Sequence, residues 1–248
     1  MPAPMLVFAD ADRVLTHPSA PACLEAARVL RRLEHERVPL VLCASKTRAE
    51  IQQLQQDLGV RHPFVCESGG AAFIPAGYFR FEVPSARSVS GYQVVEFGRP
   101  YGEIVPILQR ITRRQRIAVV GFNELSVEEV ASECELPLLQ ARLAKLREYS
   151  ERFRILDPSE TVRQRLFRSL EAVHLRCVAG DRYDLVGAGI DAGLAVGLLR
   201  ALYARALGPV VSLGPGDVWG DGGDVVDWAE AIVDGIEGRR HHAPHEVQ

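Results

Sequence analysis

The sequence contains very little lysine. Of its 29 basic residues only Lys46 and Lys145 are lysines, and the other 27 are arginines. A genome rich in G and C produces such a bias, so the ratio alone assigns no function. The scarcity still limits the chemistry, because any reaction step that requires a lysine has only two candidates.

Basic charge, long apolar runs and paired cysteines are also lacking. The net charge of −3 argues against a nucleic-acid binder that relies on a basic surface. The longest apolar runs, such as 38–45 and 116–122, are far shorter than the roughly 20 residues of a membrane span. The first ten residues have no basic region typical of a signal peptide. Five scattered cysteines indicate buried free thiols rather than disulfides or a zinc site. We therefore expect a cytoplasmic protein without nucleic-acid or membrane partners.

The first eighty residues alternate apolar runs with amphipathic helices. Residues 4–9, 38–44 and 64–66 read as buried strands. A helix opened by Ser19 follows the first strand, and a helix over 47–58 follows the second. This order predicts an α/β fold with a doubly wound parallel sheet covered by helices on both faces.

The middle of the chain has a different pattern of predicted strands and helices. Residues 83–188 mix short strands and helices and read as an inserted α+β domain. The alternating pattern returns at 189–248, with a helix opened by Asp191, a strand at 209–213 and a helix at 225–236. We therefore expect one α/β core built from 1–82 and 189–248, with the insert as a second domain.

Polar residues follow the predicted core strands where ligands of parallel sheets bind. Five of these residues are carboxylates, which repel one another unless a cation binds. Carboxylate oxygens are hard ligands of the kind that Mg²⁺ prefers. A carboxylate beside the metal is able to attack phosphorus and form an aspartyl-phosphate. Taken singly, each aspartate is also a common helix cap or turn residue. These residues are Asp10, Asp12, Ser45, Lys46, Glu67, Asp217 and Asp221.

Three stretches resemble a known family. The run VFADADRVLT, at 7–16, is similar to the first motif of the haloacid-dehalogenase (HAD) superfamily. The runs VPLVLCASKTRAEI and HPFVCESGGAAFIPAGYF resemble the mannosyl-3-phosphoglycerate phosphatase branch, in subfamily IIB. The resemblance implies a HAD-like core with a C2-type cap at 83–188. It also implies a phosphatase acting on a sugar phosphate or a phosphoglycosyl-glycerate.

The resemblance gives roles to the residues around the first two strands. Asp10 would be the nucleophile, and Asp12 the general acid and base, which requires a pKa near neutrality. Ser45 would donate a hydrogen bond to the phosphoryl oxygen. Lys46 and Arg48 would hold anionic groups of the substrate.

The resemblance also implies a Mg²⁺ site and a substrate contact in the cap. The metal ligands would be Asp10, Asp12 through its backbone carbonyl, Asp217 and Asp221. The last two fit the spacing Gly-Asp-x-x-x-Asp at 216–221, whereas an alternative alignment on 213–215 loses the first acid. In the cap, the substrate stretch near 180–183 leaves Arg182 as a candidate phosphate or substrate ligand.

Several motif positions depart from the family pattern. Arg13 and Val14 replace a Gly and a Thr, Ala192 replaces a Lys, and Gly220 replaces an Asn. In the family this lysine makes a charge contact. A contact of this kind contributes on the order of several kcal/mol to phosphoryl transfer. Two hypotheses follow. The chain is an active phosphatase, or it is a weak or inactive homologue that binds a phosphorylated metabolite or a partner enzyme. The sequence leaves the oligomeric state and the identity of the substrate open.

Overall fold

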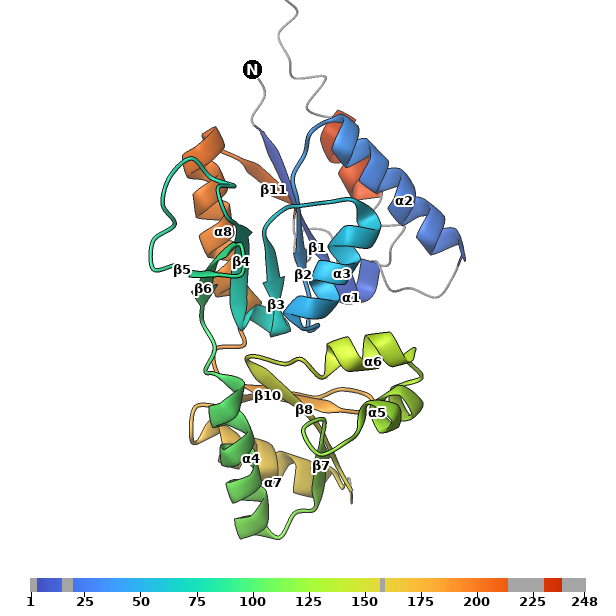
Figure 1. Ribbon diagram of the computed structural model, residues 1–248, viewed down its shortest axis with the longest axis vertical. Coiled ribbons are helices and arrows are strands. Elements are labelled where there is room, and N and C mark those ends of the chain that lie inside the picture. Colours follow the sequence, from blue (N-terminus) through green and yellow to red (C-terminus); the bar gives the residue numbers. More distant parts are fainter. Residues whose placement is uncertain (1–3, 15–19, 157–158, 214–229, 238–248) are drawn as a thin grey trace, which may run out of the picture.

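The computed structural model describes residues 4–14, 20–156, 159–213 and 230–237. It has a seven-stranded sheet and a four-stranded sheet, each packed with helices (Figure 1). The larger unit is the core and the smaller unit is the cap. The predicted combination of an α/β core and an α+β cap is therefore confirmed.

The core sheet combines parallel and antiparallel strands. They are β1 (Met5–Asp10), β2 (Leu40–Cys43), β3 (Phe64–Cys66), β4 (Ala71–Pro75), β5 (Arg87–Val89), β6 (Tyr92–Glu96) and β11 (Val211–Leu213), in the order β11-β1-β2-β3-β4-β6-β5. The four strands from β11 to β3 pair in parallel, and the rest pair antiparallel. The parallel sheet predicted from the sequence is thus present in one half of the core.

Helices cover both faces of this sheet, as expected. Those on one face are α2 (Ala20–His35), α3 (Arg48–Leu58) and a helical segment at 230–237, and the opposite face is covered by α8 (Ala192–Leu207) (Figure 1). Successive strand side chains point to opposite faces, so Val7 packs with α2 and α3 while Phe8 packs with α8. The unbroken apolar runs of the sequence reflect this burial on both sides.

Capping residues begin and end α3 where the sequence predicts. The Thr47 hydroxyl accepts a hydrogen bond from the Glu50 N–H, and the Glu50 carboxylate accepts one from the Thr47 N–H. Gly59 ends the helix with φ of 69°, a left-handed conformation that favours glycine. These caps place the residues just before α3, which carry the candidate chemistry, at a defined position beside β2.

The cap is an antiparallel sheet with helices on both sides. Its strands are β7 (Val119–Gly121), β8 (Ser150–Ile155), β9 (Arg176–Val178) and β10 (Asp184–Gly187), in the order β7-β8-β10-β9. Its helices are α4 (Tyr101–Gln115), α5 (Val127–Cys134), α6 (Leu138–Ala144) and α7 (Glu160–Glu171). α4 and α7 pack on one face, whereas α6 contacts α3 of the core. Figure 1 shows α6 lying between the two units.

The chain enters the cap later than the boundary at residue 83 expected from the sequence. β5 and β6 belong to the core sheet, because β6 pairs antiparallel with β4 along its whole length. The chain therefore leaves the core after Glu96 and returns between Gly187 and Ala192. Residues 84–88 lead into β5 and therefore belong to the core rather than to the insert. Sheet membership is a long-range pairing that strand patterning does not reveal.

No helix among the described residues is long and apolar enough to cross a membrane. Four cysteines, Cys43, Cys66, Cys134 and Cys177, are free thiols. Burial raises the pKa of Cys66 well above its ordinary value, so this thiol stays protonated.

The packing of α8 on the core sheet gives a matched pair of stability predictions. Leu199 is fully buried, whereas Leu194 on the same helix is 59% exposed. Leu199→Ala should lower the free energy of unfolding by about 3 kcal/mol, because it leaves a cavity against the sheet. Leu194→Ala should change it by less than about 0.5 kcal/mol. Urea unfolding measures both, and equal effects would contradict the packing described for α8.

Candidate active site

The carboxyl ends of β1 and β2 bring four candidate residues together. β1 and β2 are parallel neighbours with Asp10 opposite Cys43 in register. The chain then continues from β1 into the short helix α1 (Ala11–Val14), which carries Asp12. Ser45 and Lys46 follow β2 at the same edge. The predicted convergence of polar residues at this edge is therefore present for both strands.

Hydrogen bonds tie these four residues into one cluster. The Asp12 N–H donates to Asp10 Oδ1 at 2.9 Å. The Ser45 N–H donates to Asp12 Oδ2 at 2.6 Å, and Lys46 Nζ lies 3.2 Å from Asp12 Oδ1. Asp12 is thus the centre of the cluster, with one carboxylate oxygen held by an amide and the other by an ammonium.

These contacts set the protonation of Asp12. Burial raises its pKa, but the Lys46 charge and the hydrogen bonds from Ser45 lower it by more, so the net pKa lies below the ordinary value. Asp12 is therefore a carboxylate in this structure, the form that a general base requires. The sequence-based requirement of a pKa near neutrality is not met while Lys46 is its partner.

Two cap arginines, Arg147 and Arg152, reach Ser45 from the opposite side. Arg147 Nη2 donates to the Ser45 carbonyl oxygen at 3.0 Å. Arg152 Nη2 donates to Ser45 Oγ at 2.7 Å. Sequence reasoning missed both, because they are more than a hundred residues from Ser45 in the chain. The one sequence signal was weak: Arg152 and Arg154 alternate with apolar residues in β8, as polar residues on a single strand face do.

Glu67 connects the core to the cap through hydrogen bonds. It lies in the 3₁₀ turn η1 (Glu67–Gly69) after β3 and is fully buried. Its carboxylate accepts hydrogen bonds from the N–H groups of Glu148 and Tyr149 and from Ser150 Oγ. Arg147 Nη2 lies 3.5 Å from the same carboxylate. The sequence placed Glu67 among the acids of the catalytic crevice, whereas the structure assigns its hydrogen bonds to the segment that enters β8.

The two other arginines proposed from the sequence pair with carboxylates of the cap. Arg48 Nε lies 2.7 Å from Glu148 Oε1, and its guanidinium lies over the Phe73 ring. Arg182 is more than half exposed and lies 3.2 Å from Glu135. The structure therefore does not bring Arg48 or Arg182 into the cluster around Asp12, and their substrate roles stay predictions.

The predicted metal site is only partly within the described residues. Asp217 and Asp221 lie outside them. In the described ranges, no group of three His, Cys, Asp or Glu residues is close enough to hold a metal ion. Asp10 and Asp12 contribute hard oxygen donors of the type that Mg²⁺ prefers, which fits the predicted ion as far as two ligands allow.

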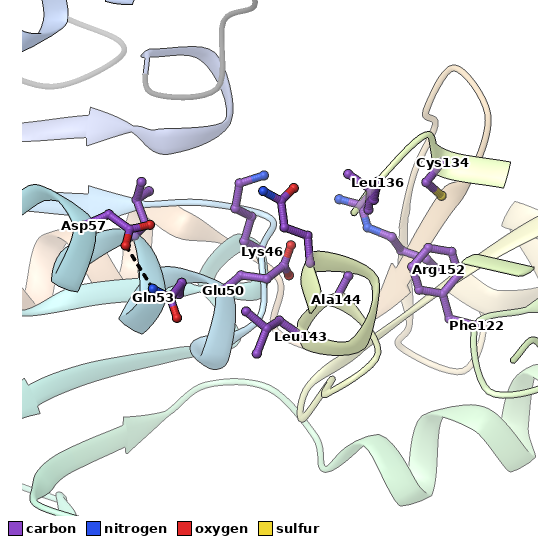
Figure 2. A pocket seen from close by; sticks show the side chains of 12 residues that line it. Lys46, Glu50, Gln53, Asp57, Phe122, Cys134, Leu136, Leu143, Ala144 and Arg152 are labelled. Atoms are coloured by element: carbon purple, nitrogen blue, oxygen red, sulfur yellow. Dashed lines mark hydrogen bonds between the residues drawn. The ribbon is translucent and has the colours of Figure 1, made fainter. Parts of the chain in front are cut away.

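A cavity of about 350 Å³ lies between the core and the cap next to this cluster. Figure 2 shows Lys46 and Glu50 on the core side and Phe122, Leu136 and Arg152 on the cap side. The volume falls in the range of small-molecule sites, and the lining mixes apolar surface with a few polar groups. The arrangement therefore offers two cations, amide groups and apolar contacts to a bound molecule.

The similarity of this chain to known proteins identifies its family. No family model matches the chain. A glucosyl-3-phosphoglycerate/mannosyl-3-phosphoglycerate phosphatase of Methanococcoides burtonii is 34% identical over 216 residues, covering 87% of this chain and 79% of that protein. A mannosyl-3-phosphoglycerate phosphatase of Pyrococcus furiosus is 33% identical over 231 residues, covering 92% of this chain and 91% of that protein. The chain belongs to the mannosyl-3-phosphoglycerate phosphatase family.

Solved structures agree with the fold of this family. A haloacid dehalogenase-like hydrolase from Bacteroides thetaiotaomicron superposes with a TM-score of 0.60 at 15% identity, over 93% of this chain and 98% of that one. A HAD subclass IIB sugar phosphatase superposes with a TM-score of 0.52 at 12% identity, over 84% and 79% of the two chains. The core and cap of this chain therefore have the fold of HAD-like hydrolases.

Two departures from the family motifs have a clear place in the structure. Arg13 lies within the helical turn of α1, where no glycine conformation is required. Ala192 is the first residue of α8, and Asp191 is the N-cap of this helix. Asp191 lies so close to Gly69 that a Cβ added to Gly69 would be 2.5 Å from backbone atoms of Asp191. Position 192 is thus near η1 but offers only a methyl group. Lys46 contacts Asp12, and Arg147 and Arg152 contact Ser45, so these three cations lie at the cluster.

The hydrogen bonds and the ion pair that Glu67 makes with the cap give a second stability prediction. Glu67→Gln should lower the free energy of unfolding by about 3 kcal/mol, because it leaves the buried Arg147 charge without its carboxylate. The exposed pair of Arg182 and Glu135 is the control, and Arg182→Gln should cost less than about 1 kcal/mol. Urea unfolding compares the two variants. A loss for Glu67→Gln as small as that for the control would contradict this role.

Proposed function

We propose that the protein is a Mg²⁺-dependent phosphatase that hydrolyses a sugar phosphate or a phosphoglycosyl-glycerate through an aspartyl-phosphate on Asp10. The observation that carries the proposal is the hydrogen-bonded cluster of Asp10, Asp12, Ser45 and Lys46 at the carboxyl ends of β1 and β2. A nucleophilic carboxylate, a second carboxylate for proton transfer, a hydroxyl donor and a cation are the parts that such a reaction needs.

The two half-reactions use the two aspartates in turn. An oxygen of Asp10 attacks phosphorus, the bond from phosphorus to the leaving alcohol oxygen breaks, and Asp12 gives that oxygen its proton. Water then attacks the aspartyl-phosphate while Asp12 accepts a proton from it, which releases inorganic phosphate and restores Asp10. Ser45 and Lys46 stabilise the negative charge on the phosphoryl oxygens.

The low pKa of Asp12 fits the second half-reaction as it stands. For the first half, Asp12 must carry a proton. A phosphoryl dianion bound beside Lys46 competes for the ammonium and adds negative charge near the carboxylate. Both effects raise the pKa of Asp12, so the substrate itself prepares the general acid.

We propose Asp10, the Asp12 backbone carbonyl, Asp217 and Asp221 as the residues that hold Mg²⁺. When bound, the ion would offset the negative charge shared by these acids and the phosphoryl group. The two described donors support this assignment, while Asp217 and Asp221 enter it from the sequence spacing alone.

The substrate class follows from the relatives and from the cavity. The relatives named above are phosphatases of glucosyl- or mannosyl-3-phosphoglycerate. In this chain the cavity beside Lys46 has side-chain amides from Gln53 and Gln140 and a basic group from Arg152. Amide groups suit sugar hydroxyls, and the positive charge of a guanidinium favours an anionic substrate. The cavity therefore supports a phosphorylated glycosyl-glycerate as substrate.

Loss of the nucleophile is the direct test of the enzyme against the binding homologue. With Mg²⁺ and p-nitrophenyl phosphate, the wild-type protein should hydrolyse the ester at least about 10³-fold faster than Asp10→Asn. Glucosyl- and mannosyl-3-phosphoglycerate should be hydrolysed with higher kcat/KM than glucose 6-phosphate. Equal background rates for the wild-type and Asp10→Asn proteins would favour the alternative, a homologue that only binds a phosphorylated metabolite.

Metal removal tests the cofactor separately. Treatment with EDTA should abolish hydrolysis, and Mg²⁺ should restore it, because the uncompensated carboxylates repel the phosphoryl group. Asp221→Asn should raise the Mg²⁺ concentration needed for half-maximal activity by at least about 10-fold. Full activity in EDTA would refute the metal requirement while leaving the role of Asp10 intact.

A further inference from the structure

Arg152 occupies an unusual position for a cap residue. On β8, Phe153 and Ile155 face the helices α4 and α7, so the alternate side chains face the other way. Of these, Arg154 pairs with Glu133 on the cap, whereas Arg152 crosses to the core and donates to Ser45 Oγ. A single strand thus carries two neighbouring arginines on one face, one bound within the cap and one bound to the candidate phosphate site.

The donor chemistry of arginine fixes the direction of the Ser45 hydroxyl. A guanidinium has only N–H donors, so Ser45 Oγ accepts from Arg152 and its own proton points elsewhere. The Ser45 hydroxyl lowers the pKa of Asp12 through a hydrogen bond to its carboxylate. The donors therefore run from Arg152 through the Ser45 hydroxyl to Asp12, so the hydroxyl proton points away from the cap and towards the carboxylates of the core.

Among the ion pairs of the described residues, none includes the Arg152 guanidinium. Burial and the neighbouring Arg147 charge lower the pKa of Arg152 by more than the charges of Asp12 and Glu50 raise it. Arg152 also lines the cavity opposite Lys46 (Figure 2). A half-buried cation of this kind favours an anion nearby, as a phosphoryl group bound by Ser45 would be.

We propose that Arg152 is a positioning residue that acts through Ser45: it holds the hydroxyl with its proton directed at the phosphoryl oxygen, and it does so only when the cap covers the core. The inference rests on the proposed function and goes beyond it, because it makes a residue of the cap part of the phosphate site. Ser45 belongs to the core and Arg152 to the cap, so the donor is oriented only in the closed arrangement, where bulk water is excluded.

A double-mutant cycle tests whether Arg152 acts through the Ser45 hydroxyl. With Mg²⁺ and p-nitrophenyl phosphate, Arg152→Ala and Ser45→Ala should each lower kcat about 10- to 100-fold, with a smaller change in KM. The double variant should be no slower than Ser45→Ala within about 3-fold, because its hydroxyl is already gone. Multiplicative effects of the two substitutions would overturn the proposal.

Three controls separate positioning from a loss of structure. Arg154→Ala removes the neighbouring arginine of the same strand face and should keep wild-type kcat. Arg152→Lys keeps a charged donor and should recover part of the lost kcat, and guanidinium ion added at millimolar concentration should partly restore Arg152→Ala but not the double variant. Thermal unfolding checks that each variant is folded. A folded Arg152→Ala protein with wild-type kcat, or one no slower than Arg154→Ala, would overturn the proposal.

A binding measurement keeps this inference distinct from the proposed function. If wild-type and Asp10→Asn proteins hydrolyse esters equally slowly, the proposed function fails, and calorimetric titration with inorganic phosphate replaces the kinetic cycle. Arg152→Ala and Ser45→Ala should then each weaken phosphate binding at least about 10-fold, and the double variant should bind no more weakly than Ser45→Ala. Wild-type phosphate affinity in Arg152→Ala would overturn the role of Arg152 whether or not the protein is an enzyme.

Discussion

The contact between the segment Ser45–Arg48 and the cap is the constraint on which the candidate site depends. The carbonyl and hydroxyl of Ser45 accept from Arg147 and Arg152, and Thr47 Oγ1 donates to the Leu143 carbonyl oxygen. Arg48 pairs with Glu148 of the cap. Lys46 Nζ and the Ser45 N–H contact Asp12 of the core. These four consecutive residues therefore join α1 of the core to the cap, and the geometry of the site follows from the position of the cap.

Much of the fold was predictable because local rules decide it. Apolar runs of the right length gave β1, β2 and β3, and the caps at Thr47 and Gly59 gave the ends of α3. The placement of Asp10, Asp12, Ser45 and Lys46 was also predictable, since residues that follow parallel strands meet at one edge of the sheet. These predictions needed only the order of elements along the chain.

The rest depends on contacts between distant segments. The sequence does not show that β6 pairs with β4, or that Glu67 serves the linker of the cap rather than the catalytic crevice. It also gives no sign that Arg152 faces Ser45, because strand alternation limits a side chain to one of two faces but does not say what lies opposite. The two cap arginines supply positive charge at a site where the family pattern has a lysine and this chain has Ala192.

In the proposed reaction Asp10 is the residue that receives the phosphoryl group. Rapid acid quench of the protein during turnover of a phosphate ester, followed by mass spectrometry of the peptide that contains Asp10, tests this directly. We expect one phosphoryl group on Asp10 in the wild-type protein and none in Asp10→Asn. Hydrolysis of the ester with no phosphorylated peptide, or with the phosphoryl group on another residue, would contradict the account.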